Sequence, residues 1–396
     1  SSTGGLSAGR KDSDTSLFPY YTDDKITESS EITGSKTLLQ ITIDNKNYLW
    51  EPFAVRYKGV YNISRNLYKN SYGNKVVFEE INHDLNVTFK YEWNSSNIYG
   101  FVKKSTLINN TSDTLQVTVL DGIQNIMPYG VEEDVQKKSS NLVDAYKKSE
   151  LEAEAGLGIY ALSAIIVDKA EPSEALKSTI VWSLGIESPT YLLSSLQLDA
   201  FRKGVAVQQE VNVKAEKGAY FTCSEIELAA NSEKKWLLIA NVNQSISDIN
   251  QVKESIKNES NLEELIHDNI TLGTRKLVQL VSASDGVQLT GDKLRNIRHF
   301  SNTLFNIMRG GIFDNNYQIE KSDFLVYIGK ANRKVFKKRE EVLSKLPALF
   351  SLSHLKEVVK DDDDKNFKRL CFEYLPLRFS RRHGDPSRPW NKFSIN

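Results

Sequence analysis

Residues 85–93 read LNVTFKYEW, and the alternation within them decides the fold class. The apolar residues Val87, Phe89 and Tyr91 are each separated by one polar residue. A period of two places these apolar side chains on one face of a strand, so the segment is predicted to be a half-buried β-strand. Residues 116–120 (QVTVL) repeat the pattern, which indicates that more than one strand of this kind is present.

The strand signal extends over more than half of the chain. Short runs rich in β-branched and aromatic residues recur over 36–245, and clusters of Asp, Asn, Gly and Ser separate them. Many short strands at this spacing predict an antiparallel sandwich of about a dozen strands. A Glu/Lys/Ala-rich interruption, in which Val135, Leu142 and Tyr146 can share a helix face, predicts a helical insertion near 131–156.

The segments on either side of this β unit differ from it in composition. Residues 1–35 are rich in Ser, Thr, Gly and Asp and lack an apolar period, which predicts an extended N-terminal arm. Within the arm, the aromatic residues of 18–21 (FPYY) are expected to dock on a sheet. Beyond the β unit the apolar residues take helical spacing, so 246–365 is predicted to form a helical linker. From Phe367 onward an extended segment is expected.

The charge of the chain is balanced, with 51 Lys and Arg residues against 51 Asp and Glu residues. A general nucleic-acid binder would carry a basic excess, so no nucleic-acid partner is expected. Residues 330–341 (KANRKVFKKREE) are predicted to open a helix with a solvated basic face, an interpretation that competes with a polyanion site. Residues 361–365 (DDDDK) are interpreted as an exposed loop.

The remaining composition argues against membranes, metals and cofactors. No apolar run approaches about 18 residues, so no membrane partner is expected. No secretory signal is recognisable, which favours a cytoplasmic location, and Ser1 in place of Met suggests that a preceding segment was removed or not included. Cys223 and Cys371 lie far apart beside apolar residues and are predicted to be buried free thiols. No His or Cys shows metal-ligand spacing, so neither a metal nor an organic cofactor is expected.

The strongest candidate for a binding loop is residues 378–391, which read RFSRRHGDPSRPWN. Its Gly-Asp-Pro-Ser turn allows arginine side chains to converge, and arginine forks suit phosphate or carboxylate. The candidate substrate- or phosphate-binding residues are Arg381, Arg382, His383, Asp385, Arg388, Trp390 and Asn391. The competing interpretation is an arginine–aspartate network that pins a long loop to the linker helices.

Two weaker candidates lie earlier in the chain. Residues 121–130 form a polar strand exit in which Gln124 and Tyr129 could contact a ligand, although a buried hydrogen-bonded corner is the favoured explanation. Arg309 precedes a Gly-Gly pair that a helix C-cap already explains, so its contact with a ligand is a secondary hypothesis.

Several segments resemble one family of enzymes. Residues 97–130 resemble the N-terminal domain of cellobiose-phosphorylase-like enzymes, which are glycoside hydrolase family 94 and its large relatives. Residues 141–148, 170–175, 196–202 and 298–313 fit the same pattern, and SRRHGDPSRPWN resembles a hallmark of the long members. The resemblance is distributed over most of the chain.

The resemblance implies an architecture and a reaction. It implies a β-rich α+β multidomain protein in which a large antiparallel β-supersandwich and a helical linker precede an (α/α)6 barrel. The barrel carries the active site and a C-terminal β domain follows it. Residues 366–396 would then be the start of a truncated catalytic barrel, and the catalytic acid would lie beyond Asn396, so no catalytic residue is assigned. The implied reaction is cleavage or formation of glucosidic bonds, with inorganic phosphate as a candidate co-substrate.

Two functional hypotheses follow. In the first, the chain is the N-terminal, non-catalytic portion of a glycoside phosphorylase or hydrolase that acts on β-linked gluco-oligosaccharides, and it is inactive alone. Its partners would be an oligosaccharide, its own missing C-terminal barrel and, as a candidate, a second copy in a homodimer. In the second, the chain is a stand-alone carbohydrate-binding or structural scaffold domain without enzymatic activity.

Overall fold

The computed structural model describes residues 4–6, 8, 9, 15–19, 26, 28–164, 176–284, 286–308 and 318–382, and it describes no side chains at 137, 373 and 375–382. The chain divides into two compact units. Unit 1 comprises Ser1–Asn70 and Asn74–Gly273, and unit 2 comprises Ser71–Gly73 and Thr274–Asn396.

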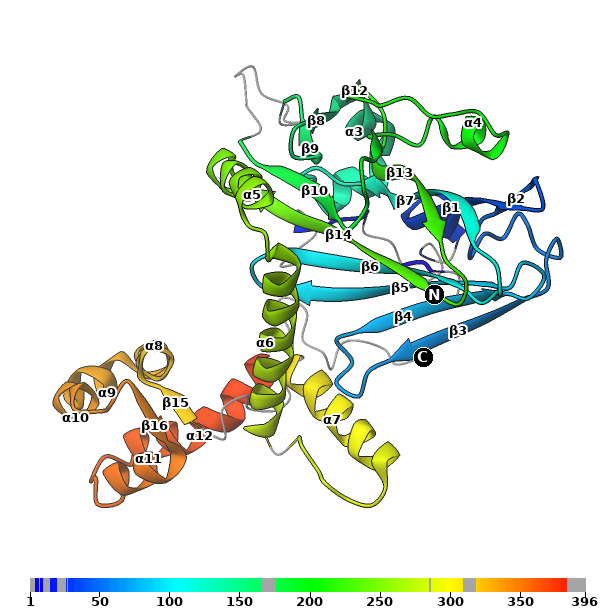
Figure 1. Ribbon diagram of the computed structural model, residues 1–396. Coiled ribbons are helices and arrows are strands. Elements are labelled where there is room, and N and C mark those ends of the chain that lie inside the picture. Colours follow the sequence, from blue (N-terminus) through cyan, green and yellow to red (C-terminus); the bar gives the residue numbers. More distant parts are fainter. Residues whose placement is uncertain are drawn as a thin grey trace. The chain divides into compact units, whose positions relative to one another are not determined.

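Two antiparallel sheets form unit 1 (Figure 1). The five-stranded sheet has the spatial order β11 (Thr190–Leu192), β13 (Gly218–Leu228), β7 (Leu115–Ile126), β1 (Gly34–Ile43) and β2 (Lys46–Trp50). The nine-stranded sheet has the order β12 (Asn212–Lys214), β8 (Lys147–Glu152), β9 (Leu157–Leu162), β10 (Ser178–Leu184), β14 (Glu233–Gln244), β6 (Gly100–Asn109), β5 (Val87–Ser96), β4 (Val76–Asn82) and β3 (Ile63–Lys69). The sandwich expected from the strand pattern is confirmed; a barrel is not shown.

The inner faces of the two sheets share one apolar core. Val87, Phe89 and Tyr91 of β5 pack in the same cluster as Val119 of β7 and Tyr220 of β13. The alternation in the sequence therefore points to the correct face of β5. Full burial of each such side chain contributes roughly 1.5–3 kcal/mol, so this core is the main support of the sandwich.

Short helical segments cover the outer face of the five-stranded sheet. Before β1 lies the 3-10 helix η2 (Ser29–Glu31). Helix α4 (Leu198–Arg202) places Phe201 against Leu120 of β7 and Phe221 of β13. The loop that carries α4 is thus anchored on the sheet by apolar contact.

Helices also cover the outer face of the nine-stranded sheet. Ile249 of α5 (Ile246–Asn258) and Ile266 of α6 (Leu262–Ser282) pack in one cluster with Trp182 of β10. Because Trp182 points away from the inner core, β10 is buried on both faces, as a central strand requires.

The described part of the N-terminal arm contacts the sandwich. Leu17 and Phe18 are almost completely buried, and the Phe18 ring meets Trp93 edge-on at a centroid distance of 6.2 Å. The Met127 N–H donates a hydrogen bond to the Leu17 carbonyl at 2.9 Å. The prediction that this aromatic segment docks on a sheet is confirmed for Phe18.

The prediction of a helical insertion near 131–156 is only partly correct. Two short helices are present, α2 (Glu133–Lys138) and α3 (Ser140–Tyr146), but strand β8 begins at Lys147. Along β8, residues Lys147, Ser149 and Leu151 are buried and alternate with less buried neighbours. A charged residue on the buried side hides the period of two, which is why the composition wrongly favoured a helix there.

Unit 2 contains a small module with its own core. Its described elements from residue 293 onward are α7 (Lys293–Met308), β15 (Gln318–Glu320), α8 (Lys321–Ala331), α9 (Arg333–Lys338), α10 (Glu340–Ser344), β16 (Leu349–Ser351), α11 (Leu352–Val359) and α12 (Lys365–Arg382). The core of the module runs from Ile319 to Tyr374 and includes Phe324, Leu355 and Phe367. Strands β15 and β16 pair across it.

Two expectations for this module need correction. Residues 330–341 do not form one helix, because Asn332 ends α8 and its side chain accepts hydrogen bonds from the backbone N–H groups of Lys334 and Val335, which starts α9. The segment from Phe367 is helical rather than extended, since it lies within α12. Residues 367, 370, 371 and 374 are buried at helical spacing, a period that outweighs the aromatic composition.

The charged stretches contact one another within unit 2. Arg339 pairs with Asp362 at 2.7 Å, and Lys338 with Asp364 at 3.3 Å. The Asp364 carboxylate also accepts the Phe367 N–H at 3.2 Å at the N-terminus of α12. The DDDDK segment is therefore a loop that leads into α12, with Asp361, Asp363 and Lys365 exposed as predicted, while Asp362 and Asp364 are partly buried and pair with part of the basic run. Among the described residues, no helix is long and apolar enough to cross a bilayer.

Candidate functional site

Most of the residues proposed for the C-terminal binding loop lie outside the described residues. His383, Asp385, Arg388, Trp390 and Asn391 are outside them. Arg381 and Arg382 end helix α12, but their side chains are not described. Arg309 also lies outside the described residues. The assignment of these residues to ligand binding stays a prediction.

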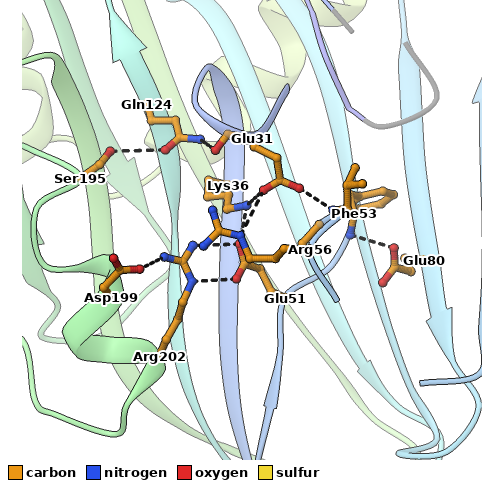
Figure 2. Close-up of polar contacts among 12 residues, drawn as sticks. Glu31, Lys36, Glu51, Phe53, Arg56, Glu80, Gln124, Ser195, Asp199 and Arg202 are labelled. Atoms are coloured by element: carbon orange, nitrogen blue, oxygen red, sulfur yellow. Dashed lines mark hydrogen bonds and ion pairs between the residues drawn. The ribbon is translucent and has the colours of Figure 1, made fainter. Parts of the chain in front are cut away.

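Gln124 lies in a buried hydrogen-bonded corner (Figure 2). Its side-chain amide donates to the Glu31 carbonyl at 2.7 Å, and Ser195 Oγ donates to its Oε1 at 3.3 Å. Asn125, the next residue, has a positive φ of 58° and donates to Thr33 Oγ1 at 2.8 Å. These contacts join β7, the start of β1 and the loop before α4.

Tyr129 lies near the start of β10. Lys177 Nζ stands 5.4 Å from the centroid of its ring, within the range of a cation–π contact. Thr179 Oγ1 donates to the Met127 carbonyl at 2.7 Å, which holds this segment against β10. Gln124 and Tyr129 therefore contact different parts of the sandwich.

A charged network lies beside this corner and contains no residue that the sequence analysis proposed for a binding site (Figure 2). Arg202 of α4 donates to both oxygens of Glu51, at 2.9 and 3.0 Å, and Lys36 also pairs with Glu51. Lys36 pairs with Glu31 at 2.6 Å, and Asp199 pairs with Arg202 at 2.5 Å. The sequence gives no local signal for these contacts, since Arg202 and Glu51 are 151 residues apart.

The electrostatics of this network are those of a structural clamp. Burial raises the pKa of Glu51, but its hydrogen bonds to Arg202 and the charge of Lys36 outweigh burial and the net pKa is lowered. The Glu51 side chain is fully buried, so its charge depends on these partners. The network ties α4 to the end of β2 and leaves Glu51 no exposed oxygen for a substrate.

A second charged pair lies inside the sandwich. Lys103 of β6 and Asp121 of β7 are both fully buried and 2.6 Å apart. Asp121 also accepts hydrogen bonds from Thr37, Ser105 and Trp236 at 2.6 to 2.8 Å. Burial lowers the pKa of Lys103, and the Asp121 charge opposes that shift. Because the pair has no access to solvent, its role is structural.

A cleft of about 570 Å³ opens on unit 1 beside α5. Its walls are Thr15 of the N-terminal arm, the turn 97–99 between β5 and β6, Ile180 and Trp182 on β10, residues 241–244 at the end of β14, and one face of the segment 248–262. Pockets that take small ligands have volumes of roughly 300–1,000 Å³, so this cleft has a suitable size. Its wall residues come from distant parts of the chain.

Two local features shape the cleft. Gly100 has a φ of +90°, and a Cβ there would lie 2.3 Å from the Ala240 carbonyl oxygen, so only glycine lets the 97–99 turn approach β14 this closely. Ser245 and Asp248 form a capping box at the start of α5, with the Ser245 N–H donating to Asp248 at 2.8 Å. The hydrogen bonds from Ser245 lower the pKa of Asp248.

The cleft presents both hydrogen-bond donors and hydrogen-bond acceptors. Trp182 lines the cleft and is 2% exposed, and among the described residues no group accepts a hydrogen bond from its indole N–H. Glu259 accepts a hydrogen bond from Ser255 Oγ at 3.0 Å through only one carboxylate oxygen. Burial raises the pKa of Tyr99, and the charge of Glu259 adds to the rise. Among the described residues that line the cleft there is neither lysine nor arginine.

The comparison with family models gives one match. Residues 313–376 match glycoside hydrolase family 149 insertion domain 1. The matched range contains the whole of the apolar core that runs from Ile319 to Tyr374. The match relates this part of the chain to the insertion domain of a glycoside hydrolase family, and it does not single out family 94.

Similar solved structures are distant. A protein described as a kojibiose phosphorylase from the human microbiome aligns with 68% of this chain and 31% of its own, at 10% identity and a TM-score of 0.40. A polysaccharide lyase aligns with 62% of this chain and 31% of its own, at 8% identity and a TM-score of 0.32. A family GH92 α-mannosidase from Bacteroides thetaiotaomicron aligns with 62% of this chain and 28% of its own, at 10% identity and a TM-score of 0.30.

The chain thus spans less than a third of each of these structures. At such TM-scores, the fold is established by the sheet topology of the chain itself. No curated protein matches the chain.

Proposed function

We propose that this chain is the N-terminal, non-catalytic portion of a glycoside phosphorylase or glycosidase that acts on β-linked gluco-oligosaccharides. The observation that carries the proposal is the match of residues 313–376 to a glycoside hydrolase insertion domain. The match falls on a module that has its own apolar core and that follows a two-sheet sandwich in the chain. This order of parts agrees with the resemblance of the sequence to cellobiose-phosphorylase-like enzymes.

In this proposal each part of the chain has a defined role. The sandwich shapes one wall of the substrate cleft and offers a surface for homodimerisation. Arg381, Arg382 and Arg388 hold a sugar or a phosphate ion, because arginine forks bind such oxygens in pairs. Inorganic phosphate attacks the anomeric carbon, the glucosidic bond breaks, and a general acid outside this chain gives the leaving oxygen its proton. The products are a sugar 1-phosphate and a shortened oligosaccharide.

The competing function is a stand-alone carbohydrate-binding or scaffold domain. A binding module with a flat aromatic platform would expose aromatic rings on one sandwich face. Trp50, Tyr91, Trp93 and Trp182 are instead 2–7% exposed, as expected for core residues. The cleft beside α5 is the observation that favours carbohydrate binding by the chain itself.

A turnover assay separates the two functions. The whole protein, as its gene encodes it, and the 396-residue chain are each incubated with cellotriose, with and without phosphate. Release of glucose 1-phosphate and of reducing ends is measured. The proposal predicts turnover by the whole protein and none by the chain. If the whole protein turns over no β-linked gluco-oligosaccharide, the enzyme assignment is wrong; if the chain alone is active and Asp385→Asn abolishes that activity, the non-catalytic assignment is wrong.

A further inference from the structure

We propose that the cleft beside α5 binds a neutral sugar residue. Its volume of about 570 Å³ suits a ligand of one or two pyranose rings in the range of small-molecule pockets. All of its described wall residues belong to unit 1, namely to the sandwich, its first covering helices and Thr15 of the N-terminal arm. The proposal rests on the proposed function only for the choice of gluco-oligosaccharides as the ligand to test.

The walls of the cleft combine apolar and polar surface. Ile180, Val252 and Leu262 give it apolar patches, and Tyr99 adds a half-buried aromatic ring. A pyranose has apolar C–H faces and a rim of hydroxyl groups, and it therefore matches a pocket with apolar walls and a few polar groups. A purely apolar ligand would leave the polar groups of this cleft unpaired.

The hydrogen-bonding groups select a ligand that both donates and accepts. The indole N–H of Trp182 can donate a hydrogen bond to a ligand, while the second oxygen of the exposed Glu259 can accept one. Gln251, an exposed residue of α5 that lines the cleft, can supply both a donor and an acceptor through its side-chain amide. Hydroxyl groups meet all of these needs. An ammonium ion has no acceptor and could not satisfy Trp182.

The charge of the cleft argues against anionic ligands. Asp248 and Glu259 line it, and none of its described lining residues is a lysine or an arginine. A phosphate or a sugar phosphate would meet two carboxylates and, among the described lining residues, no cation, which is unfavourable at short range. The expected ligand is therefore an uncharged saccharide.

Titration calorimetry of the 396-residue chain tests the proposal. Cellotriose is the probe, glucose 1-phosphate is the anionic comparison, and tetramethylammonium is the cationic comparison. We expect saturable binding of one cellotriose per chain and weaker or no binding of the two charged probes. Absence of cellotriose binding up to about 10 mM, or tighter binding of either charged probe, overturns the proposal.

Variants locate the binding in the cleft. Glu259→Gln should weaken cellotriose binding about ten-fold, because a hydrogen bond to a charged carboxylate becomes a weaker one to a neutral amide oxygen. Trp182→Phe should weaken it about three- to ten-fold by removing a single neutral donor. Glu254→Gln makes the same chemical change at a residue of α5 that does not line the cleft. Its dissociation constant for cellotriose should stay within two-fold of that of the unmodified chain. Gln251→Ala, at an exposed position, keeps the test valid if the Trp182 variant does not fold.

The outcomes are distinguishable from those of the turnover assay. If all variants bind cellotriose like the unmodified chain, the cleft assignment is wrong, whatever the whole protein catalyses. If the cleft variants lose binding while the whole protein shows no turnover, the cleft assignment stands and the enzyme assignment is wrong.

Discussion

Asp121→Asn should destabilise the sandwich more than most single substitutions. Asp121 accepts hydrogen bonds from Lys103 and Thr37 through Oδ1 and from Ser105 and Trp236 through Oδ2, all at 2.6 to 2.8 Å. The amide keeps one acceptor oxygen but turns an NH2 group toward two donors, and it leaves the Lys103 cation unpaired. Removing one partner of a buried ion pair costs about 3–5 kcal/mol.

The size of this effect can be separated from a general loss of packing by a double-mutant cycle. Lys103→Met removes the cation and leaves a buried carboxylate with its three neutral donors, so it should also be destabilising. In the double variant neither unpaired charge remains. Its cost should therefore fall short of the sum of the single costs by about 1–3 kcal/mol.

Urea unfolding followed by tryptophan fluorescence is a suitable assay. The four described tryptophans, Trp50, Trp93, Trp182 and Trp236, all lie in the sandwich unit, so their emission reports on it. If the two single costs add in the double variant to within about 0.5 kcal/mol, or if Asp121→Asn costs less than about 1 kcal/mol, the buried pair is not coupled as described.

Three further predictions concern other parts of the chain. The folded-state pKa of Glu51 is below its ordinary value of 4.5, so the ionised carboxylate stabilises the fold above pH 4.5, and this stabilisation is lost as the pH falls through the folded-state pKa. Glu51→Gln should therefore flatten the acid limb of a curve of unfolding free energy against pH. An unchanged acid limb would contradict this. Gly100→Ala should lower the free energy of unfolding by about 1–3 kcal/mol, because its positive φ and the Ala240 carbonyl both oppose a Cβ, whereas wild-type stability would show that the turn is free to shift. Burial raises the pKa of Cys371 to about 12, so labelling of the native chain with a thiol reagent near pH 8 should be slow at this residue until denaturant is added; rapid labelling would mean that the module around it opens readily.

Local patterns in the sequence predicted the sandwich because sheet burial is a local property. In β5 the residues Val87, Phe89 and Tyr91 point inward, as their spacing required. The same reasoning failed at β8, where the buried position nearest the helical insertion is Lys147. Its ammonium group pairs with Asp144 at 2.7 Å, and this contact makes burial of a charged residue possible.

The error at α12 has a different cause. Aromatic and apolar residues are frequent in strands, and the segment from Phe367 was assigned on composition. Its spacing was nevertheless informative, since Phe367, Leu370, Cys371 and Tyr374 fall on one helix face and are all buried. Periodicity should therefore outrank composition where the two disagree.

The candidate cleft could not be predicted from the sequence. Its walls join the 97–99 turn, Trp182, the end of β14 and α5, and only the pairing of β10 and β6 with β14 brings them together. No local motif marks Glu259 or Gln251 as part of one surface. The arginine-rich loop 378–391 shows the opposite case, because its motif is clear in the sequence while its structure lies outside the described residues.

Site-resolved NMR of the tryptophan indole groups tests most directly whether this chain recognises carbohydrate through the cleft. The indole N–H signals of the 15N-labelled chain are recorded during titration with cellotriose, and Trp182→Phe assigns the signal of Trp182. The account predicts that the Trp182 signal shifts progressively and saturates, while those of the core residues Trp50, Trp93 and Trp236 stay in place. An unmoved Trp182 signal at a cellotriose concentration that binds the chain would contradict it.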